Sequence, residues 1–438
     1  MRHLITPRLR SLLTVLAVVA GSSIAHKALA QTGDEELPPI IISNAGVQML
    51  RLAVPRAEGD NGAVAVETMS KDMDITGLFQ VLDPASFPQQ LQSEGMAFSS
   101  ALWTQVGAQV VIKMKASGGQ LEGKLFVVAR GDQPTLTKTY HHADIRDAIH
   151  EFANDIVQST TGKRGVFGSR IAFAMSGHGS HEIGSIDMDG GRMAVLTKMA
   201  SDSLLPAYSP GGAEIAFTSY ARNNPDLWIV SSGGGRARRV SKQPGLNTGA
   251  SWSPDGRVIA LTLSHEGNSE IYRVSPDDGR VLARLTQSPA IDSSPSFSPD
   301  GSQIAFVSNR QGSPQIFVMP ATGGGAKRVT FQGKYNQTPR FNPRTDKPQI
   351  AFTGRDEKGV FDVFILDLKA NKIDRVAPLP PLTTKVSNLD PTWSPDGRLL
   401  AYTSSRGGIW VYNPETHHEV QISKGGTSSP SWGPAPRR

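Results

Sequence analysis

Residues 393–403 read Trp-Ser-Pro-Asp-Gly-Arg-Leu-Leu-Ala-Tyr-Thr, an aromatic side chain followed by a tight turn and a short apolar strand. Close copies of this phrase begin at Trp252 and Phe297, and weaker copies begin at Tyr208, Phe341 and Trp432. Successive aromatic residues are 44, 45, 44, 52 and 39 positions apart. A strand–turn–strand unit with this period is typical of a β-propeller, in which each repeat forms one blade.

The chemistry of the phrase explains why it repeats. Proline fixes φ at the first corner of the turn, and Asp-Gly supplies the second corner and the position with positive φ. The apolar strand after the turn is Ile259–Leu261 in one repeat and Ile304–Phe306 in the next. A third strand follows, as in Ile271–Val274 and Ile316–Met319, and then a fourth that ends in Leu-Thr or Val-Thr. Four short strands per repeat match a propeller blade.

The two ends of the repeat region predict how the ring closes. The strand Ile171–Phe173 opens the array without the turn phrase before it, and Ser431–Pro434 ends it without the apolar strand after it. Joining these halves gives six complete blades and leaves no free sheet edge between the first and the last. The alternative is an open array of β-hairpins, which would leave two half-blades unpaired.

The first thirty residues have the pattern of a secretory signal. Arg2, Arg8 and Arg10 precede an apolar run over residues 12–20, and Ala28-Leu29-Ala30 is a small-x-small cleavage site. We therefore expect cleavage between Ala30 and Gln31. An uncleaved membrane anchor is the alternative, but the apolar run is short for a bilayer.

Composition narrows the function classes. The formal net charge is +6, and a leader with four cations and no acid would take most of it away, leaving +2. Nucleic-acid binding then loses its electrostatic support. The chain has no cysteine, which excludes disulfides, thiolate metal sites and a cysteine nucleophile. No later segment is long and apolar enough to cross a membrane, so we expect contact with membranes only through partners.

The chain is predicted to be mainly β, a six-bladed β-propeller over residues 166–438 preceded by a small α/β domain over 31–165 and a cleaved signal peptide over 1–30. In the α/β domain, apolar patterning predicts strands at 47–54, 79–82, 110–112, 121–128 and 135–140, and helices at 64–79, 101–106 and 144–157. Residues 31–39 are acidic and polar without periodicity, and we expect a flexible tail.

A search for catalytic chemistry predicts none, and no cofactor or metal site. The chain lacks the Gly-x-Ser-x-Gly elbow of serine hydrolases. Gly118–Lys124 has the spacing of a phosphate-binding loop, but Leu125 replaces the required hydroxyl residue, so a hairpin turn is expected. His178, His181 and Glu182 are the best metal-like cluster, with a solvated loop as the favoured reading. The aspartates of the turn phrases are expected to serve the turns themselves.

Better functional candidates stand just before each aromatic residue, at one equivalent place in every blade. Propeller geometry gathers these small polar segments around one mouth of the central channel, where they are suited to gripping a peptide segment of a partner. As loop residues they are expected to be largely exposed. The alternative is that they only cap strands. The residues expected to contact a partner are Asp202, Asn247, Thr248, Asp292, Ser293, Asn336, Gln337, Asn388 and Asp390.

Over essentially its whole length the chain resembles the TolB family, the periplasmic components of the Tol-Pal system of Gram-negative bacteria. The resemblance is carried by the signal, the segment Gly77–Gln90 (GLFQVLDPASFPQQ), the Trp-Ser-Pro-Asp-Gly repeats and the closing Trp-x-Pro triplet, in that order. One departure is that Leu246 stands where a histidine is often found in the family.

The resemblance implies a periplasmic binding protein that is not an enzyme. Its propeller mouth would dock on the outer-membrane lipoprotein Pal, with other outer-membrane proteins as further partners, and its mature N-terminus would contact TolA. The tail residues are Gln31, Asp34, Glu35 and Glu36. This would support outer-membrane invagination at cell division and envelope integrity. The alternatives are a lyase-like or glycan-binding periplasmic propeller, and a purely structural scaffold.

Overall fold

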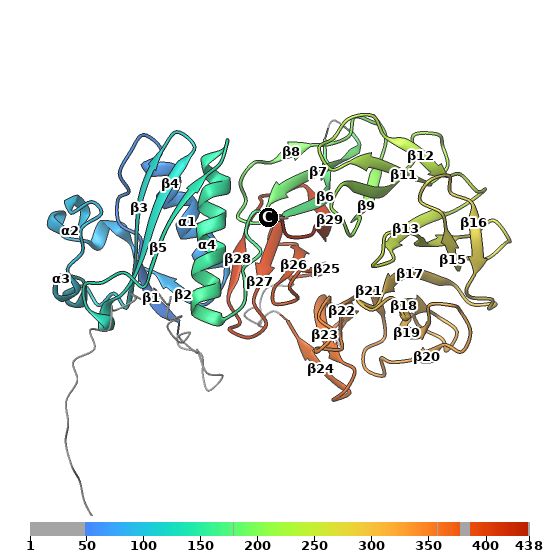
Figure 1. The fold of residues 1–438 in the computed structure, drawn as a ribbon. Coiled ribbons are helices and arrows are strands. Elements are labelled where there is room, and N and C mark those ends of the chain that lie inside the picture. The colour runs from blue at the N-terminus through green and yellow to red at the C-terminus, as the bar shows by residue number, and fades with distance from the viewer. Residues whose placement is uncertain (1–48, 178, 357, 377–385, 437–438) are drawn as a thin grey trace, which may run out of the picture. The chain divides into compact units, whose positions relative to one another are not determined.

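The computed structural model describes residues 49–177, 179–356, 358–376 and 386–436. The expected leader, its cleavage site at Ala30 and Gln31, and the acidic tail with Asp34, Glu35 and Glu36 lie outside the described residues. In the described part, a five-stranded sheet with helices comes first and a ring of four-stranded sheets follows (Figure 1).

The first sheet has the strand order β2-β1-β3-β4-β5, with β1 parallel to β2 and β3 and the other pairs antiparallel. Alternate residues of its strands face two apolar cores. Leu52 and Ile112 join the core under helices α1 and α4, while Val111 faces a second core with Trp103. The bounds are β1 Leu50–Ala53, β2 Phe79–Val81, β3 Val110–Ser117, β4 Gln120–Val127, β5 Leu136–His141, α1 Gly62–Ile75, α2 Gln89–Ser93, α3 Ser100–Gln105 and α4 Ile145–Thr161.

Each strand and helix expected in the α/β region has a counterpart there. The helix expected over 64–79 ends earlier, at Ile75, because Thr76 and Gly77 turn the chain into β2. A short helix α2 and a 3-10 turn at Pro84–Ser86 were not anticipated in the proline-rich stretch. Gly118 is the turn between β3 and β4, so the phosphate-loop spacing is a hairpin as predicted.

Helix α4 begins and ends where its sequence directs. Asp144 caps its N-terminus by accepting a hydrogen bond from the Arg146 backbone N–H at 2.9 Å. Gly162, with φ of 72°, ends the helix in the left-handed conformation that favours glycine. The chain then reaches the first propeller strand, β6, at Arg170.

The described residues form six four-stranded sheets, which we number as blades in the order of their inner strands (Figure 1). Blade 1 comprises β29 Thr427–Trp432, β6 Arg170–Ser176, β7 His181–Asp187 and β8 Ala194–Val195; blade 2, β9 Ser203–Tyr208, β10 Glu214–Ser219, β11 Asp226–Ser231 and β12 Arg238–Ser241; blade 3, β13 Asn247–Trp252, β14 Ile259–Leu263, β15 Glu270–Val274 and β16 Val281–Arg284. Blade 4 comprises β17 Asp292–Phe297, β18 Gln303–Ser308, β19 Gln315–Pro320 and β20 Lys327–Arg328; blade 5, β21 Asn336–Phe341, β22 Gln349–Arg355, β23 Phe361–Asp367 and β24 Lys372–Arg375; blade 6, β25 Asn388–Trp393, β26 Leu400–Ser404, β27 Ile409–Tyr412 and β28 Glu419–Gln421.

Blade 1 confirms the predicted ring closure. Strand β29, from the end of the propeller sequence, pairs antiparallel with β6, so that Trp432 lies opposite Ile171. The inner strands contact one another in the cycle β9, β13, β17, β21, β25, β29 and back to β9. The open array of hairpins is therefore wrong.

The repeated turns use their polar residues internally. In blade 3 the Asp255 carboxylate accepts hydrogen bonds from the Ser253 hydroxyl at 2.5 Å and from the Arg257 backbone N–H at 3.0 Å. Gly256 has φ of 72°, which glycine adopts without strain. Asp300 and Asp396 make the same serine contact. These aspartates serve their own turns.

Candidate functional site

The mouth of the propeller can be located by a hydrogen bond that recurs in every blade. In each blade, the carbonyl oxygen of the residue just before the inner, first strand accepts a hydrogen bond. The donor is the backbone N–H of the residue at, or just after, the end of the second strand of the same blade, at 2.7–3.4 Å. This contact joins two connections on the same end of the ring. We call the six accepting residues the rim positions: Asp202, Leu246, Ile291, Tyr335, Ser387 and Gly426.

Three consecutive blades present apolar side chains at the rim positions. Leu246, Ile291 and Tyr335 of blades 3, 4 and 5 are 37%, 52% and 36% exposed. Tyr335 also packs edge-on against Phe361, with 5.7 Å between ring centroids. The sequence reasoning named the polar neighbours and missed these residues. The signal was present, because an apolar residue directly precedes the polar start of each of these three strands.

The polar residues that follow the rim positions are buried, and the expectation that they are exposed is wrong for four of them. Asn247, Asp292, Asn336 and Asn388 are the first residues of their inner strands and are at most 3% exposed. Strand pairing carries them inward, out of the loops. Their equivalents in the other two blades are Ser203 and Thr427.

The Asn247 amide shows what these buried side chains do. Its oxygen accepts hydrogen bonds from the Ser241 hydroxyl at 2.7 Å and the Gln243 N–H at 2.9 Å, and its nitrogen donates to the Gln243 and Gly245 carbonyls. The amide thereby fixes the connection that leads into the blade. The interpretation of these residues as strand caps fits the four buried positions.

The Asp292 side chain is also engaged within the fold, through a charged carboxylate in place of an amide. Its carboxylate accepts from the Arg310 guanidinium at 2.7 Å, and Arg310 in turn lies over the rings of Phe306 and Phe317. Burial raises the pKa of Asp292, and the nearby Ser308 hydroxyl and Arg310 oppose the rise. One oxygen of this buried carboxylate is thus committed to Arg310, while the other, Oδ1, is buried without a hydrogen-bond partner among the described residues.

Asn336 and Asn388 are also engaged within the fold. The Asn336 amide donates to the Gln315 side chain at 2.8 Å, and the Asn388 amide donates to Asp362 at 2.8 Å. Each therefore ties its inner strand to the third strand of the preceding blade.

The remaining candidates at the mouth are more accessible. Asp202 is exposed and accepts from the His181 backbone N–H, while Thr248, Ser293, Gln337 and Asp390 are half-buried along the inner strands. Asp390 has φ of 54°, as part of a bulge that interrupts the pairing of every inner strand. Burial raises the pKa of its carboxyl, and Arg340 partly offsets the rise. Its carboxylate accepts from the Ser429 hydroxyl at 3.2 Å, which links blades 6 and 1.

The cluster of His178, His181 and Glu182 does not assemble as a set of ligands in the described residues. His178 lies outside them. The His181 ring faces Asp202 at 2.8 Å, whereas Glu182 is held by the Thr197 hydroxyl and the Met199 and Ala200 N–H groups. The two side chains thus serve different connections.

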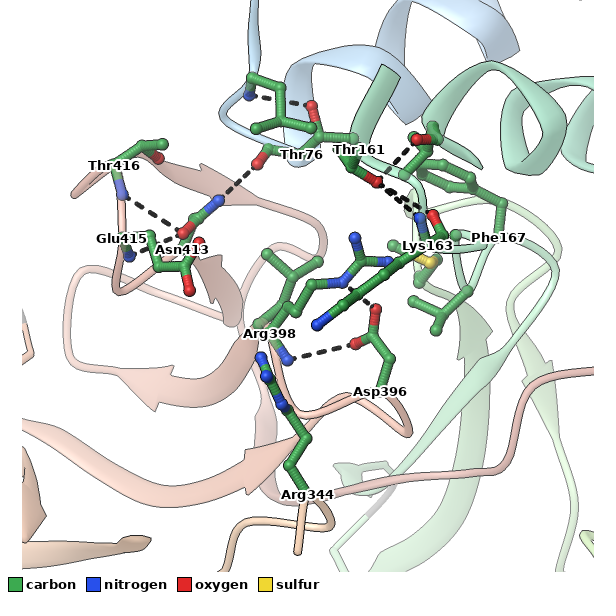
Figure 2. Close-up of a pocket in the computed structure, with 16 residues that line it drawn as sticks. Thr76, Thr161, Lys163, Phe167, Arg344, Asp396, Arg398, Asn413, Glu415 and Thr416 are labelled. Carbon is green, nitrogen blue, oxygen red and sulfur yellow. Dashed lines mark hydrogen bonds and ion pairs between the residues drawn. The ribbon is translucent and has the colours of Figure 1, made fainter. Parts of the chain in front are cut away.

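A cavity of about 230 Å³ lies between the α/β region and blades 5, 6 and 1 (Figure 2). Its apolar lining includes Leu78, Phe167 and Leu399, and polar side chains surround it. Figure 2 shows Asn413 reaching the Thr76 carbonyl, at 2.6 Å, and Asp396 beside Arg398, at 2.5 Å. The Asn413 contact links blade 6 to the α/β region, and Arg398 adds a second link by donating to the Arg164 carbonyl at 2.6 Å, whereas the Asp396–Arg398 pair stays within one turn of blade 6.

Two family models match this chain. The model of the TolB beta propeller domain matches residues 157–436, and the model of the TolB amino-terminal domain matches residues 38–132. The Tol-Pal system protein TolB of Anaeromyxobacter dehalogenans is 38% identical over 213 residues, which are 46% of this chain and 49% of that protein. A TolB homolog of Chlorobium chlorochromatii is 36% identical over 190 residues, which are 40% of this chain and 42% of that protein. The matches thus span about half the length of these curated relatives.

A solved structure supports the same fold. The crystal structure of TolB from Acinetobacter baumannii matches with a TM-score of 0.75 at 24% identity, over 88% of this chain and 97% of that one. In the part of the chain that the structure describes, no helix has the length and apolar character needed to span a bilayer.

Proposed function

Because the chain belongs to the TolB family, a non-enzymatic family of the Tol-Pal system, we propose that it is a periplasmic adaptor. Its propeller mouth docks on the lipoprotein Pal, and its mature N-terminus contacts TolA. The adaptor thereby couples the two membranes during outer-membrane invagination and maintains envelope integrity. We further propose that signal cleavage between Ala30 and Gln31 delivers it to the periplasm.

The observation that carries the Pal proposal is the apolar arc of the rim, which we define as Leu246, Ile291 and Tyr335. Exposed apolar side chains that gather on one face are typical of protein–protein contact sites, especially when polar groups surround them. Thr248, Ser293 and Gln337 stand two positions beyond the three rim residues and supply hydrogen-bonding groups deeper in the mouth. A partner segment would bury the arc and bond to these groups.

The buried polar residues give the mouth its shape without themselves binding. Asn247, Asp292, Asn336 and Asn388 hold the connections on which the rim residues stand. We therefore assign partner contact to the rim and to Asp202, Thr248, Ser293, Gln337 and Asp390, and assign a supporting role to the four buried side chains.

The proposed TolA contact rests on the family alone. It concerns Gln31, Asp34, Glu35 and Glu36, which lie outside the described residues. The lyase-like or glycan-binding alternative would require uncommitted charged groups converging at the mouth. Among the described residues of the mouth, Asp292 is paired with Arg310 through one oxygen, and Asp202 is paired with His181.

Calorimetric titration with the purified soluble domain of Pal tests the proposal. Replacing Ile291 and Tyr335 together by serine should weaken binding at least tenfold, because central apolar contacts each contribute about 2 kcal/mol or more at hot spots. Leu282→Ser is the matched control, since Leu282 is 40% exposed on the outer strand β16, away from the mouth. Unchanged binding by the double variant would show that Pal docks elsewhere.

A second measurement connects binding to the cell. Bacteria that carry the Ile291→Ser, Tyr335→Ser variant as their sole copy should leak periplasmic proteins and divide in chains. The Leu282→Ser variant should restore both properties. If the double variant restores them as well, the apolar arc has no part in the function.

A further inference from the structure

A buried cluster of charged residues joins the α/β region to blade 1. Asp72 comes from α1, His150 from α4, and Asp187 and Asp189 from the end of β7 and the turn that follows it. All four side chains are at most 2% exposed. They lie in the apolar core shared by the α/β region and the propeller, where an unpaired charge is strongly unfavourable.

His150 is the centre of this cluster. Its Nδ1 lies 2.7 Å from the Asp72 carboxylate, and its Nε2 lies 3.9 Å from the Asp187 carboxylate. Among the described residues, Nε2 and the second oxygen of Asp72 have no hydrogen-bond partner. The ring therefore stands between a carboxylate of one part of the chain and a carboxylate of the other.

The propeller carboxylates have further partners. Asp187 pairs with Arg192 at 2.6 Å and lies 3.5 Å from Arg170, and Asp189 pairs with Arg146. Among the described residues, His150 is the one cation in contact with Asp72. The charged or titratable groups around His150 in the described residues are Asp72 of α1; Arg146, Asp147, Glu151 and Asp155 of α4; Lys138 and Tyr140 of β5 and His142 just after it; Arg164 of the connecting segment; Arg170 of β6; and Asp187, Asp189 and Arg192 around β7.

A metal ion is the first alternative to consider, because Asp72, His150 and Asp189 each place a donor atom within 4.8 Å of the others. The partners that Asp189 already has disfavour a metal ion at this place. One oxygen of Asp189 binds Arg146 and the other accepts from the Gly191 N–H at 3.0 Å. A divalent cation would have to displace a guanidinium and lie beside it. A proton on the imidazole supplies the missing positive charge without moving any group.

We propose that Asp72 and His150 form a proton-operated latch between the α/β region and the propeller. With the imidazole protonated, His150 carries the charge that holds Asp72 of α1 on one side and faces Asp187 of blade 1 on the other. Loss of that proton leaves the buried Asp72 carboxylate without a contacting cation, and the interface loosens.

The direction in which the pKa of His150 shifts agrees with this geometry. Burial opposes the charged imidazole, but the Asp72 and Asp189 carboxylates outweigh it and raise the pKa of His150 above its ordinary 6.5. Burial raises the pKa of Asp72 from 3.8 to about 6. A pKa raised by folding stabilises the closed interface fully at low pH, and this stabilisation is lost as pH rises through the folded value. This pH dependence belongs to His150. Between pH 3.8 and about 6 the raised pKa of Asp72 favours its neutral form, so the charged pair forms above that range and is lost when His150 gives up its proton.

Hydrogen exchange of the full chain between pH 5.5 and 9 tests the latch, with rates corrected for base-catalysed intrinsic exchange. Protection of α1 and of the turn after β7 should fall with rising pH by up to about tenfold per unit while one proton is released. Strands β14 and β15 of blade 3, remote from the cluster, should keep their protection. His150→Gln should remove the pH dependence at α1, and Asp72→Asn should do the same while retaining the histidine.

His142→Gln is the matched control, because His142 contacts Glu151 of the same helix α4 at 2.7 Å but is about one-third exposed. It should behave like the parent protein. An equal pH dependence in the parent and both latch variants would overturn the proposal. A rise in protection when Zn²⁺ is added, lost in His150→Gln, would overturn it in favour of a metal site.

Discussion

The propeller meets its surroundings in two places that are built in opposite ways. On blade 1, beside α1 and α4, it buries Asp187 and Asp189; Asp189 pairs with Arg146 of α4 across the interface, and Asp187 pairs with Arg192 of its own blade. At the mouth of blades 3–5, it pairs its polar strand starts internally and leaves Leu246, Ile291 and Tyr335 exposed. On the proposed function, in which a separate protein docks at the mouth, the difference follows from how long each partner stays.

A partner in the same chain is always present, so its charges can be buried and matched. A separate partner must be able to leave, and charges buried in its absence would have to be desolvated and rehydrated at each cycle. Exposed apolar side chains can be uncovered with far smaller penalties. We therefore expect damage near blade 1 to impair folding and damage at the rim to impair binding.

The largest effect is expected from opening blade 1. Deleting residues 429–438 removes most of β29, including the buried Trp432, whose indole N–H donates to the Ser169 hydroxyl at 2.9 Å. Truncating a buried Trp to Ala already costs about 3–5 kcal/mol, and the deletion also exposes the edge of β6. Urea unfolding should show a stability loss of more than about 4 kcal/mol.

The conservative variant Trp432→Phe separates ring closure from the loss of a side chain. It keeps β29 and its pairing with β6 and should lose clearly less stability than the deletion. If the deletion protein unfolds at the same urea concentration as the parent, the two chain ends do not complete a shared blade.

The second prediction compares two aspartates of the propeller. Asp187→Ala removes the buried carboxylate that Arg192 contacts. Breaking a fully buried pair costs about 3–5 kcal/mol, and because Arg192 is partly exposed and keeps Asp144 and Asp147 as partners, we expect a loss toward the lower end of that range. Asp255→Ala removes a turn carboxylate whose side chain is 57% exposed, and should cost less than about 1 kcal/mol. Urea unfolding of both variants checks the ranking, and equal losses would contradict the asymmetry between the two regions.

The sequence predicted the ring because its turns are local and repeated. Pro254-Asp255-Gly256 determines its own conformation, and the half-blades at Ile171 and Trp432 complement each other directly. The burial of individual side chains could not be predicted from the repeat in the same way. The period shows that Asn247, Asp292 and Asn336 are equivalent, but their burial depends on where strand pairing begins and where each bulge falls.

The interface on blade 1 was missed for a related reason. Asp72 and His150 are 78 residues apart, and neither belongs to a repeat or motif. Each is unremarkable on its own helix. Their contact arises only because α1 and α4 pack side by side against the sheet and the turn after β7.

A third prediction contrasts neighbouring residues of one strand entry. Asn336→Ala leaves the Gln315 side chain without one hydrogen-bond partner in the core and should destabilise the protein by about 1–3 kcal/mol. Tyr335→Ser removes a partly exposed side chain and should cost less, within about 1 kcal/mol, while weakening Pal binding. Thermal unfolding and calorimetric titration of both variants measure the two effects. Intact Pal binding by Tyr335→Ser together with a large stability loss would reverse the assignment.

The smallest effect is expected at the exposed margin of the interface with the α/β region. His418, in the turn between β27 and β28, lies 3.1 Å from Asp74 of α1, and this hydrogen bond raises the pKa of His418 against the opposing effect of burial. The stabilisation should be complete below the ordinary value of 6.5 and be lost as pH rises through the folded value. Because both side chains are partly exposed, it should amount to less than about 1 kcal/mol.

The measurement is the difference in unfolding free energy between the parent and His418→Gln at pH 5.5 and pH 9. That difference should be largest at the lower pH and disappear at the higher one, and Asp74→Asn should reproduce it. A difference that does not change with pH would mean that His418 stabilises the interface by packing alone. A difference of several kcal/mol would mean that the margin is as tightly coupled as the buried cluster around His150. Burial depth would then not decide how strongly this interface senses protons.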